Sequence, residues 1–200
     1  MRSTGRNIAK RVALAAPGVL MALAIARAAA VTPLGEPPPG DLAVVESLSG
    51  IDHVPTRGTL DGLMGGAAES MLIAIARGIA EESADPGVRI RALRALAAYP
   101  SAATENALRD AIADHAGEEE LDTLYLRAAV DSLVQVAGPD AVTDLVPLLD
   151  HSSRDVRAST ARGLGDTGSE AAVSPLRARL SVEEVGQVRL AIAEALRVLE

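Results

Sequence analysis

Apolar residues recur three and four positions apart over most of the chain from residue 56 onward, which is the spacing of one face of an α-helix. Four stretches repeat one pattern, in which an apolar residue and an arginine lead to a second apolar anchor; they begin at Val88-Arg89, Leu126-Arg127, Val156-Arg157 and Val188-Arg189. The four arginines are 38, 30 and 32 residues apart. Repeats of this length are typical of helix pairs that stack into a solenoid, and few runs alternate with period two as strands do. The pattern therefore predicts an all-α fold of about four helix pairs.

Helix start and stop signals set the expected bounds of these helices. Asp85 and Pro86 suit the N-cap and the first position of a helix that ends near residue 99. Ser181 and Glu184 have the spacing of a capping box for the last helix, which runs to the end of the sequence. Thr56 or Thr59 is expected to cap a short helix that ends at residue 64. The other expected helices span residues 67–82, 103–115, 121–136, 141–149, 156–164 and 170–180.

Proline and glycine residues fall inside or at the end of three expected helices. Pro147 and Pro175 fall inside expected helices, so each lies in the first turn of a late-starting helix or kinks the helix. Gly163 and Gly165 lie at the end of the first helix in the best copy of the repeat and are interpreted as a helix stop.

The N-terminus has the order of a secretory signal: a basic stretch, an uncharged run of 15 residues from Val12 to Ala26, and small residues up to Ala30. Residues 1–30 are therefore predicted to be a signal peptide, with an uncleaved membrane anchor as the alternative. The proline-rich residues 31–55 are expected to be a linker, and residues 56–200 the repeat domain. An exported protein, periplasmic or extracellular, follows from this interpretation.

Charge and composition narrow the classes of partner. The formal net charge is −8, but residues 31–200 carry 14 arginines against 27 acids, which gives −13. Such a body repels phosphate backbones and anionic lipid, and two tyrosines with no Trp or Phe provide almost no surface for stacking bases. We expect no nucleic acid partner, and membrane contact only through an uncleaved N-terminal segment.

A search for catalytic or metal chemistry finds no site. Asp166-Thr167-Gly168 matches the tripeptide of aspartic proteases, but those need two copies, and here the single copy suits a turn between helices. His53, His115 and His151 lack a second ligand at helical spacing, and residues 118–120 lack the spaced oxygens of a calcium loop. The chain has no Cys, and residues 31–200 have no Lys. We expect no cofactor, no metal and no enzymatic activity.

The repeat resembles the HEAT-like repeats, in particular the short form found in phycobilin lyases, over residues 85–200 and loosely over 56–84. The best copy runs from Asp155-Val156-Arg157 to Leu180. The resemblance implies a right-handed α-α superhelix, in which the repeated Asp and Arg bond between neighbouring repeats. The residues of this expected ladder are Asp85, Arg89, Arg127, Asp155, Arg157 and Arg189, and the rung at Arg127 has no preceding Asp.

The function expected from such a stack is that of a non-enzymatic scaffold that binds a protein partner. Arg109, Arg177 and Arg179 are candidates to pair with an acidic ligand, while Leu190 and Val198 give the last helix an apolar outer side for a partner or a second copy of the chain. Two alternatives stay open: an enzyme or accessory of the bilin-lyase type, which rests on the resemblance alone, and a structural spacer.

Overall fold

The structure is a computed structural model that describes residues 46–49, 54–79, 85–117 and 119–200. The predicted signal segment 1–30, most of the predicted linker, His53 and Glu118 lie outside these ranges. The chain divides into two units, 1–37 and 38–200, and all described residues belong to the second. Every regular element within the described ranges is a helix, which confirms the all-α prediction.

The helices follow one another with short turns. The α-helices are α3 (Arg57–Met64), α4 (Ala68–Ala76), α5 (Pro86–Leu96), α6 (Ala102–Asp114), α7 (Glu120–Ala137), α8 (Val142–Leu145), α9 (Arg154–Asp166), α10 (Val173–Val182) and α11 (Gly186–Leu199). Short 3-10 segments are η1 (Gly65–Ala67), η3 (Gly138–Ala141), η4 (Val146–Asp150) and η5 (Glu170–Ala172).

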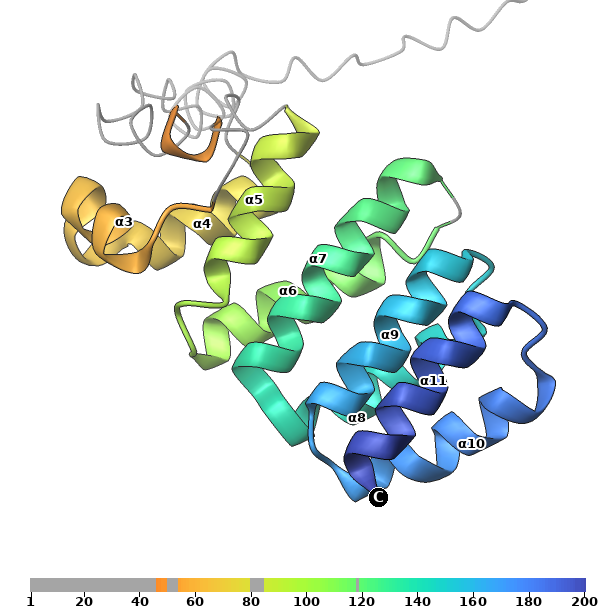
Figure 1. The fold of residues 1–200 in the computed structure, drawn as a ribbon. Coiled ribbons are helices and arrows are strands. Elements are labelled where there is room, and N and C mark those ends of the chain that lie inside the picture. The colour runs from red at the N-terminus through yellow and green to blue at the C-terminus, as the bar shows by residue number, and fades with distance from the viewer. Residues whose placement is uncertain (1–45, 50–53, 80–84, 118) are drawn as a thin grey trace, which may run out of the picture. The chain divides into compact units, whose positions relative to one another are not determined.

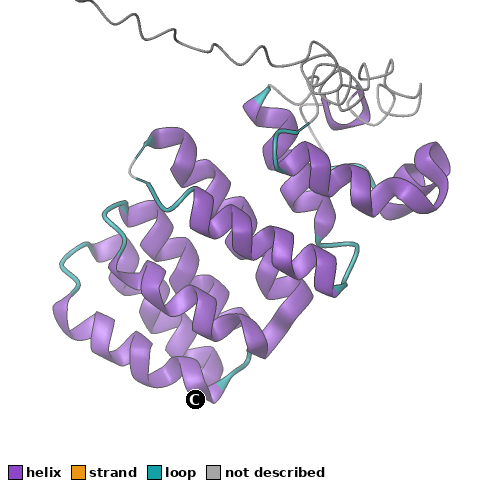
Figure 2. Cartoon of the chain, turned by 180° about the vertical axis from the view of Figure 1, so that it is seen from behind, coloured by secondary structure: helices purple, strands orange, loops and turns teal. Residues whose placement is uncertain are grey.

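Helices α5, α7, α9 and α11 run side by side as one layer (Figure 1). Helices α6, α8 and α10 lie behind them, and the view from behind shows the turns that join the two layers (Figure 2). Helix α6 packs against α7, and α10 packs against α11. This is the stacking of helix pairs that the repeat predicts; the right-handed sense of the superhelix stays a prediction.

The core consists of aliphatic side chains, as the composition requires. Alanines such as Ala92, Ala128 and Ala158 are fully buried in the front layer, where their small size lets adjacent helices approach closely. The largest fully buried side chains are Leu48, Leu60, Leu72, Ile75, Leu93, Leu96, Leu108, Leu126, Leu133, Leu145, Leu164 and Leu176.

Two glycines inside α9 set its distance from both neighbours. A Cβ atom at Gly163 would lie 3.2 Å from a methyl of Val130 on α7, and one at Gly165 would lie 2.9 Å from the Cα and Cβ of Ala195 on α11. The expected helix stop at these glycines is therefore wrong. They are contact positions, and α9 continues to Asp166 because its end is set by the turn at Gly168, whose φ is 65°.

Local capping signals account for the N-terminal helices. The side chains of Thr56, Asp85 and Ser101 each accept a backbone N–H of the helix that follows, so the predicted caps of α3 and α5 are confirmed. The predicted capping box of Ser181 and Glu184 is wrong. Helix α10 runs on to Val182, and the Ser181 hydroxyl donates to a carbonyl within its own helix.

The two prolines inside expected helices have different effects. Pro147 falls in η4, so the stretch expected as one helix over 141–149 consists of a single α-helical turn between two 3-10 segments. Pro175 is the third residue of α10, where a missing amide hydrogen costs no intrahelical bond.

One stretch, Arg57–Ala76, is long and apolar enough to cross a membrane, with a mean hydropathy of 1.2. Gly65 divides it, because its φ of 59° ends α3 before α4 begins. Leu60, Leu72 and Ile75 are fully buried in the described unit, so the apolar character of this stretch forms part of its core.

Candidate functional site

Three of the four repeated arginines bind the helix that carries them to the end of the segment before it. Arg89 donates to the carbonyl of Ala76 at 3.2 Å from both Nε and Nη2. Arg157 donates to the carbonyls of residues 151 and 152, and Arg189 to those of residues 180 and 183. These carbonyls lie at or just beyond helix ends, where intrahelical donors are missing.

The aspartates of the expected ladder do not bond to its arginines. Asp85 caps its own helix, and Asp155 lies 3.9 Å from its neighbour Arg154 on the surface. Among the described residues, no ion pair joins a ladder aspartate to a ladder arginine, so the predicted Asp–Arg bonding is wrong. The reason is that unpaired carbonyls at the helix ends are closer acceptors for the arginines than the exposed carboxylates.

Glu183 supplies the buried acid that the sequence reasoning missed. Its side chain is 1 % exposed. Arg157 binds both carboxylate oxygens at 2.8 and 3.1 Å, Arg179 donates at 2.7 and 3.0 Å, and the Val185 amide donates at 2.9 Å. Arg179 also pairs with Asp150 at 2.8 Å, so the cluster joins the loops before α9 and before α11.

The ionisation of Glu183 follows from these contacts. The hydrogen bond from Arg157 is the largest influence, and with the Val185 amide and Arg179 it outweighs burial and lowers the pKa of Glu183 to about 2. The carboxylate is charged at all physiological pH values, and every contact holds it in place. The cluster is therefore a structural junction between two loops.

The arginines expected to attract an acidic ligand already have carboxylate partners within the chain. Arg109 pairs with Glu105 and with Asp144, at 3.0 and 2.8 Å. Arg177 pairs with the side chain of Glu200 at 2.9 Å, and Arg179 belongs to the junction just described. They are therefore occupied within the chain. The next candidates for an acidic ligand are front-layer arginines that have no carboxylate partner among the described residues.

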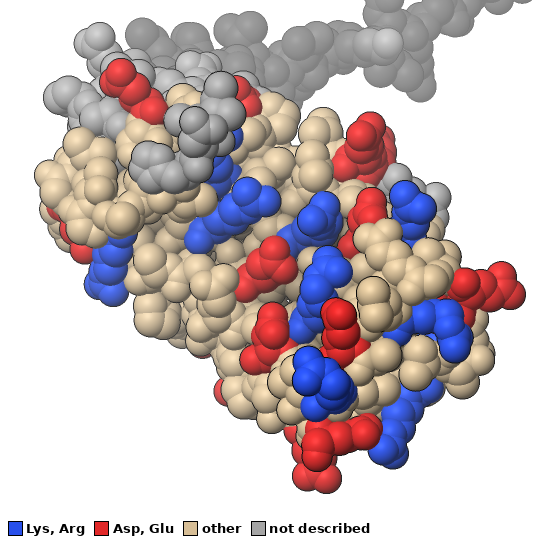
Figure 3. Space-filling model, viewed as in Figure 1, with Lys and Arg blue, Asp and Glu red and all other residues tan. Residues whose placement is uncertain are grey.

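The face shown in Figure 3 carries arginines and acids interspersed with one another. Asp131 of α7 accepts a hydrogen bond from Ser159 of α9 at 3.3 Å. Burial raises the pKa of Asp131, while the Ser159 hydrogen bond and the charges of Arg127, Arg94 and Arg162 oppose that rise. These three arginines thus surround one carboxylate, and none of them makes an ion pair with a described residue.

The sequence comparisons agree with this arrangement of helices. Residues 118–197 match the family model for HEAT repeats. This part of the chain is a HEAT-repeat segment. It contains α7 to α11 and both layers of the stack. No curated protein matches the chain.

The outer side of α11 is the exposed end of the HEAT-repeat segment. Leu190 is 61 % exposed and Val198 is 63 % exposed, as their positions in the last helix predict. Glu194 and Arg197 lie between them on the same side of the helix, so the surface combines apolar and charged groups.

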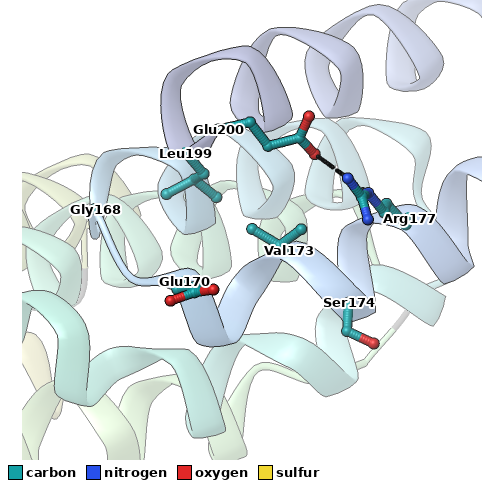
Figure 4. A pocket seen from close by; sticks show the side chains of 7 residues that line it. All are labelled: Gly168, Glu170, Val173, Ser174, Arg177, Leu199 and Glu200. Carbon is teal, nitrogen blue, oxygen red and sulfur yellow. Dashed lines mark hydrogen bonds and ion pairs between the residues drawn. The ribbon is translucent and has the colours of Figure 1, made fainter.

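A groove lies where α10 and the end of α11 meet. It is lined by Val173 and Leu199, with the Arg177–Glu200 ion pair along one side (Figure 4). The groove is open to solvent, and its residues provide contact surface.

Residues considered for catalysis or metal binding have structural contacts. Thr167 and Gly168 form the turn after α9, where the Thr167 hydroxyl donates to the Leu164 carbonyl at 2.6 Å. His115 binds Asp122 at 2.8 Å, and His151 connects its own loop to the Gly117 carbonyl at 3.1 Å. Within the described ranges, no group of three potential metal ligands occurs.

Proposed function

We propose that this protein is a non-enzymatic scaffold that binds a protein partner through its HEAT-repeat segment. HEAT repeats commonly serve as protein-interaction scaffolds, which supports the general class. The observation that carries the proposal is the exposure of Leu190 and Val198 on the last helix of the stack. A large apolar side chain left in water at the open end of a repeat array gains free energy when a partner covers it.

The proposal includes export to the cell envelope. Its support is the order of basic, apolar and small residues over 1–30. The mature protein then begins after Ala28 or Ala30, and its stack forms the right-handed superhelix that the repeat resemblance implies.

The proposal is tested by crosslinking and pull-down from native extract with the full chain as bait. The variant Leu190→Glu with Val198→Glu places two charges on the exposed side of α11 and leaves the core intact. We expect it to keep its helical circular dichroism and to lose the captured partner. The intact mass of the bait recovered from the extract shows whether residues 1–28 or 1–30 have been removed.

The matched control is Ala102→Glu with Asn106→Glu, which adds the same two carboxylates to exposed positions of α6. It is expected to retain the partner. Equal capture by both double variants would contradict a binding role for α11. Loss of a self-association step in sedimentation, with no other protein captured, would identify a second copy of the chain as the partner.

A further inference from the structure

Three arginines on neighbouring helices have no carboxylate partner in the described part of the chain. They are Arg94 on α5, Arg127 on α7 and Arg162 on α9. Other arginines of the second layer, such as Arg109 and Arg177, are paired within the chain. The unpaired charges are therefore concentrated on the front layer, where α5, α7 and α9 pack side by side.

The three positions lie together because of the helix register. Arg127 lies one turn before Asp131 on α7, and Arg162 lies one turn after Ser159 on α9. The hydrogen bond from Ser159 to Asp131 brings these two turns side by side. Arg94 extends the group onto α5, which packs on the other side of α7.

Arg127 provides an independent sign that an acceptor is missing. Its Nε atom is buried and has no hydrogen-bond partner among the described residues. Buried donors in folded proteins nearly always have an acceptor, and an unsatisfied one on a charged group is costly. The repeated arginines at positions 89, 157 and 189 all reach backbone carbonyls, so Arg127 is the exception in its own series.

The charge of the group selects an acidic ligand. At Asp131, three guanidinium groups act on one carboxylate, so this part of the front layer is locally positive on a body whose net charge is negative. Guanidinium groups form paired hydrogen bonds with carboxylates, and the separate carboxylates of a peptide can reach the arginines while avoiding Asp131. Asp166 and Glu194 lie beside Arg162, so a continuous phosphate backbone bound along the arginines would meet carboxylates, which disfavours nucleic acid.

We propose that Arg94, Arg127 and Arg162 bind a short acidic peptide segment of a protein partner, whose carboxylates pair with the solvent-facing parts of the three guanidinium groups. The inference rests on the proposed scaffold function and names the chemistry of a partner, at a surface separate from the outer side of α11.

The test measures binding of a fluorescein-labelled hexaglutamate peptide to the full chain by fluorescence anisotropy at low salt. Saturable binding is expected, and Arg127→Gln and Arg162→Gln are each expected to raise Kd about tenfold, the size of one charge-assisted hydrogen bond. The control Arg154→Gln changes an exposed arginine on the same α9 helix and is expected to alter Kd less than about twofold.

Asp131→Asn separates a ligand site from a structural one. Removing the carboxylate takes away the acid on which all three arginines act and is expected to lower Kd several-fold, whereas a purely structural Asp131 would leave Kd unchanged. Circular dichroism on each variant establishes that the fold is intact.

Three outcomes would overturn the inference: no saturable binding, equal Kd changes for Arg127→Gln and Arg154→Gln, or tighter binding of a single-stranded oligonucleotide at the same arginines. The Leu190→Glu with Val198→Glu variant keeps peptide binding if the two surfaces are independent. A failed pull-down with intact peptide binding then refutes the α11 surface alone, and the converse result refutes the arginine site alone.

Discussion

The role of a single residue in this protein depends on the residues that it contacts from another part of the chain. Glu183 is four positions after Arg179, a pairing visible in the sequence, but its stronger partner Arg157 is 26 positions away. The adjacent Glu184 is exposed and has no such contacts. Two neighbouring glutamates therefore differ completely in importance, because only one of them points into the junction between the loops.

The first prediction concerns Glu183→Gln, which leaves the guanidinium of Arg157 buried beside a neutral amide. Breaking one side of a buried ion pair costs about 3 kcal/mol or more, so we expect the free energy of unfolding at pH 7 to fall by that amount. Urea denaturation followed by circular dichroism measures it. Glu184→Gln is the control, with an expected change under about 0.5 kcal/mol; equal effects of the two changes would contradict the assignment.

Glu183 also makes the stability of the stack depend on pH in the acid range. The pKa of Glu183 is lowered from 4.5 to about 2, so its stabilising contribution is complete above pH 4.5 and is lost as pH falls towards 2. The Gln variant cannot take up that proton. Its stability is therefore expected to fall less steeply over this pH range than that of the wild type.

At the scale of elements, α9 is the helix on which the HEAT-repeat segment is organised. Gly163 faces α7 and Gly165 faces α11, so one helix approaches both neighbours closely. The close approach depends on the absence of a side chain at these positions. Intrinsic helix propensity favours alanine over glycine by about 1 kcal/mol, and packing overrides that preference here.

A second prediction follows for Gly165→Ala. The new Cβ would lie 2.9 Å from the Cα and Cβ of Ala195, so either α9 or α11 must shift. Overpacking of this kind costs about 1–3 kcal/mol, and we expect a net loss of stability despite the better helix propensity. Gly186→Ala is the control, because no atom lies within 4 Å of its Cβ position. Thermal unfolding that ranks the two variants the other way would contradict the packing argument.

At the scale of the whole described unit, the local stability of a front-layer helix depends on its position in that layer. Helices α7 and α9 each pack against a front-layer neighbour on both sides, whereas α11 has α9 on one side only. In a stack whose elements contact only their neighbours, an end helix opens at a lower free energy than a central one.

Hydrogen exchange measured by mass spectrometry tests this gradient. We expect the backbone amides of α11 to exchange faster than those of α7 and α9, and Gly165→Ala to speed exchange in α11 more than in α5. Uniform exchange in all four helices would mean that the unit opens as one, without the expected order along the row.

Much of the architecture could be predicted from local signals. The apolar spacing at 88, 126, 156 and 188 and the Thr56 and Asp85 caps depend on interactions between residues close in sequence, so they can be recognised without knowing the fold. The exposure of Leu190 and Val198 was predictable for the same reason, because both lie on the side of the last helix away from its apolar stripe.

The sequence by itself determined that the chain forms stacked helices and where most of them begin, because caps and periodicity are properties of neighbouring residues. Only the tertiary structure decided which charged side chains form ion pairs within the chain. Arg109, Arg177 and Arg179 found partners 35, 23 and 29 positions away, while Arg127 found none among the described residues. Such pairings depend on which turns the stack places side by side, and side-chain chemistry alone does not specify that.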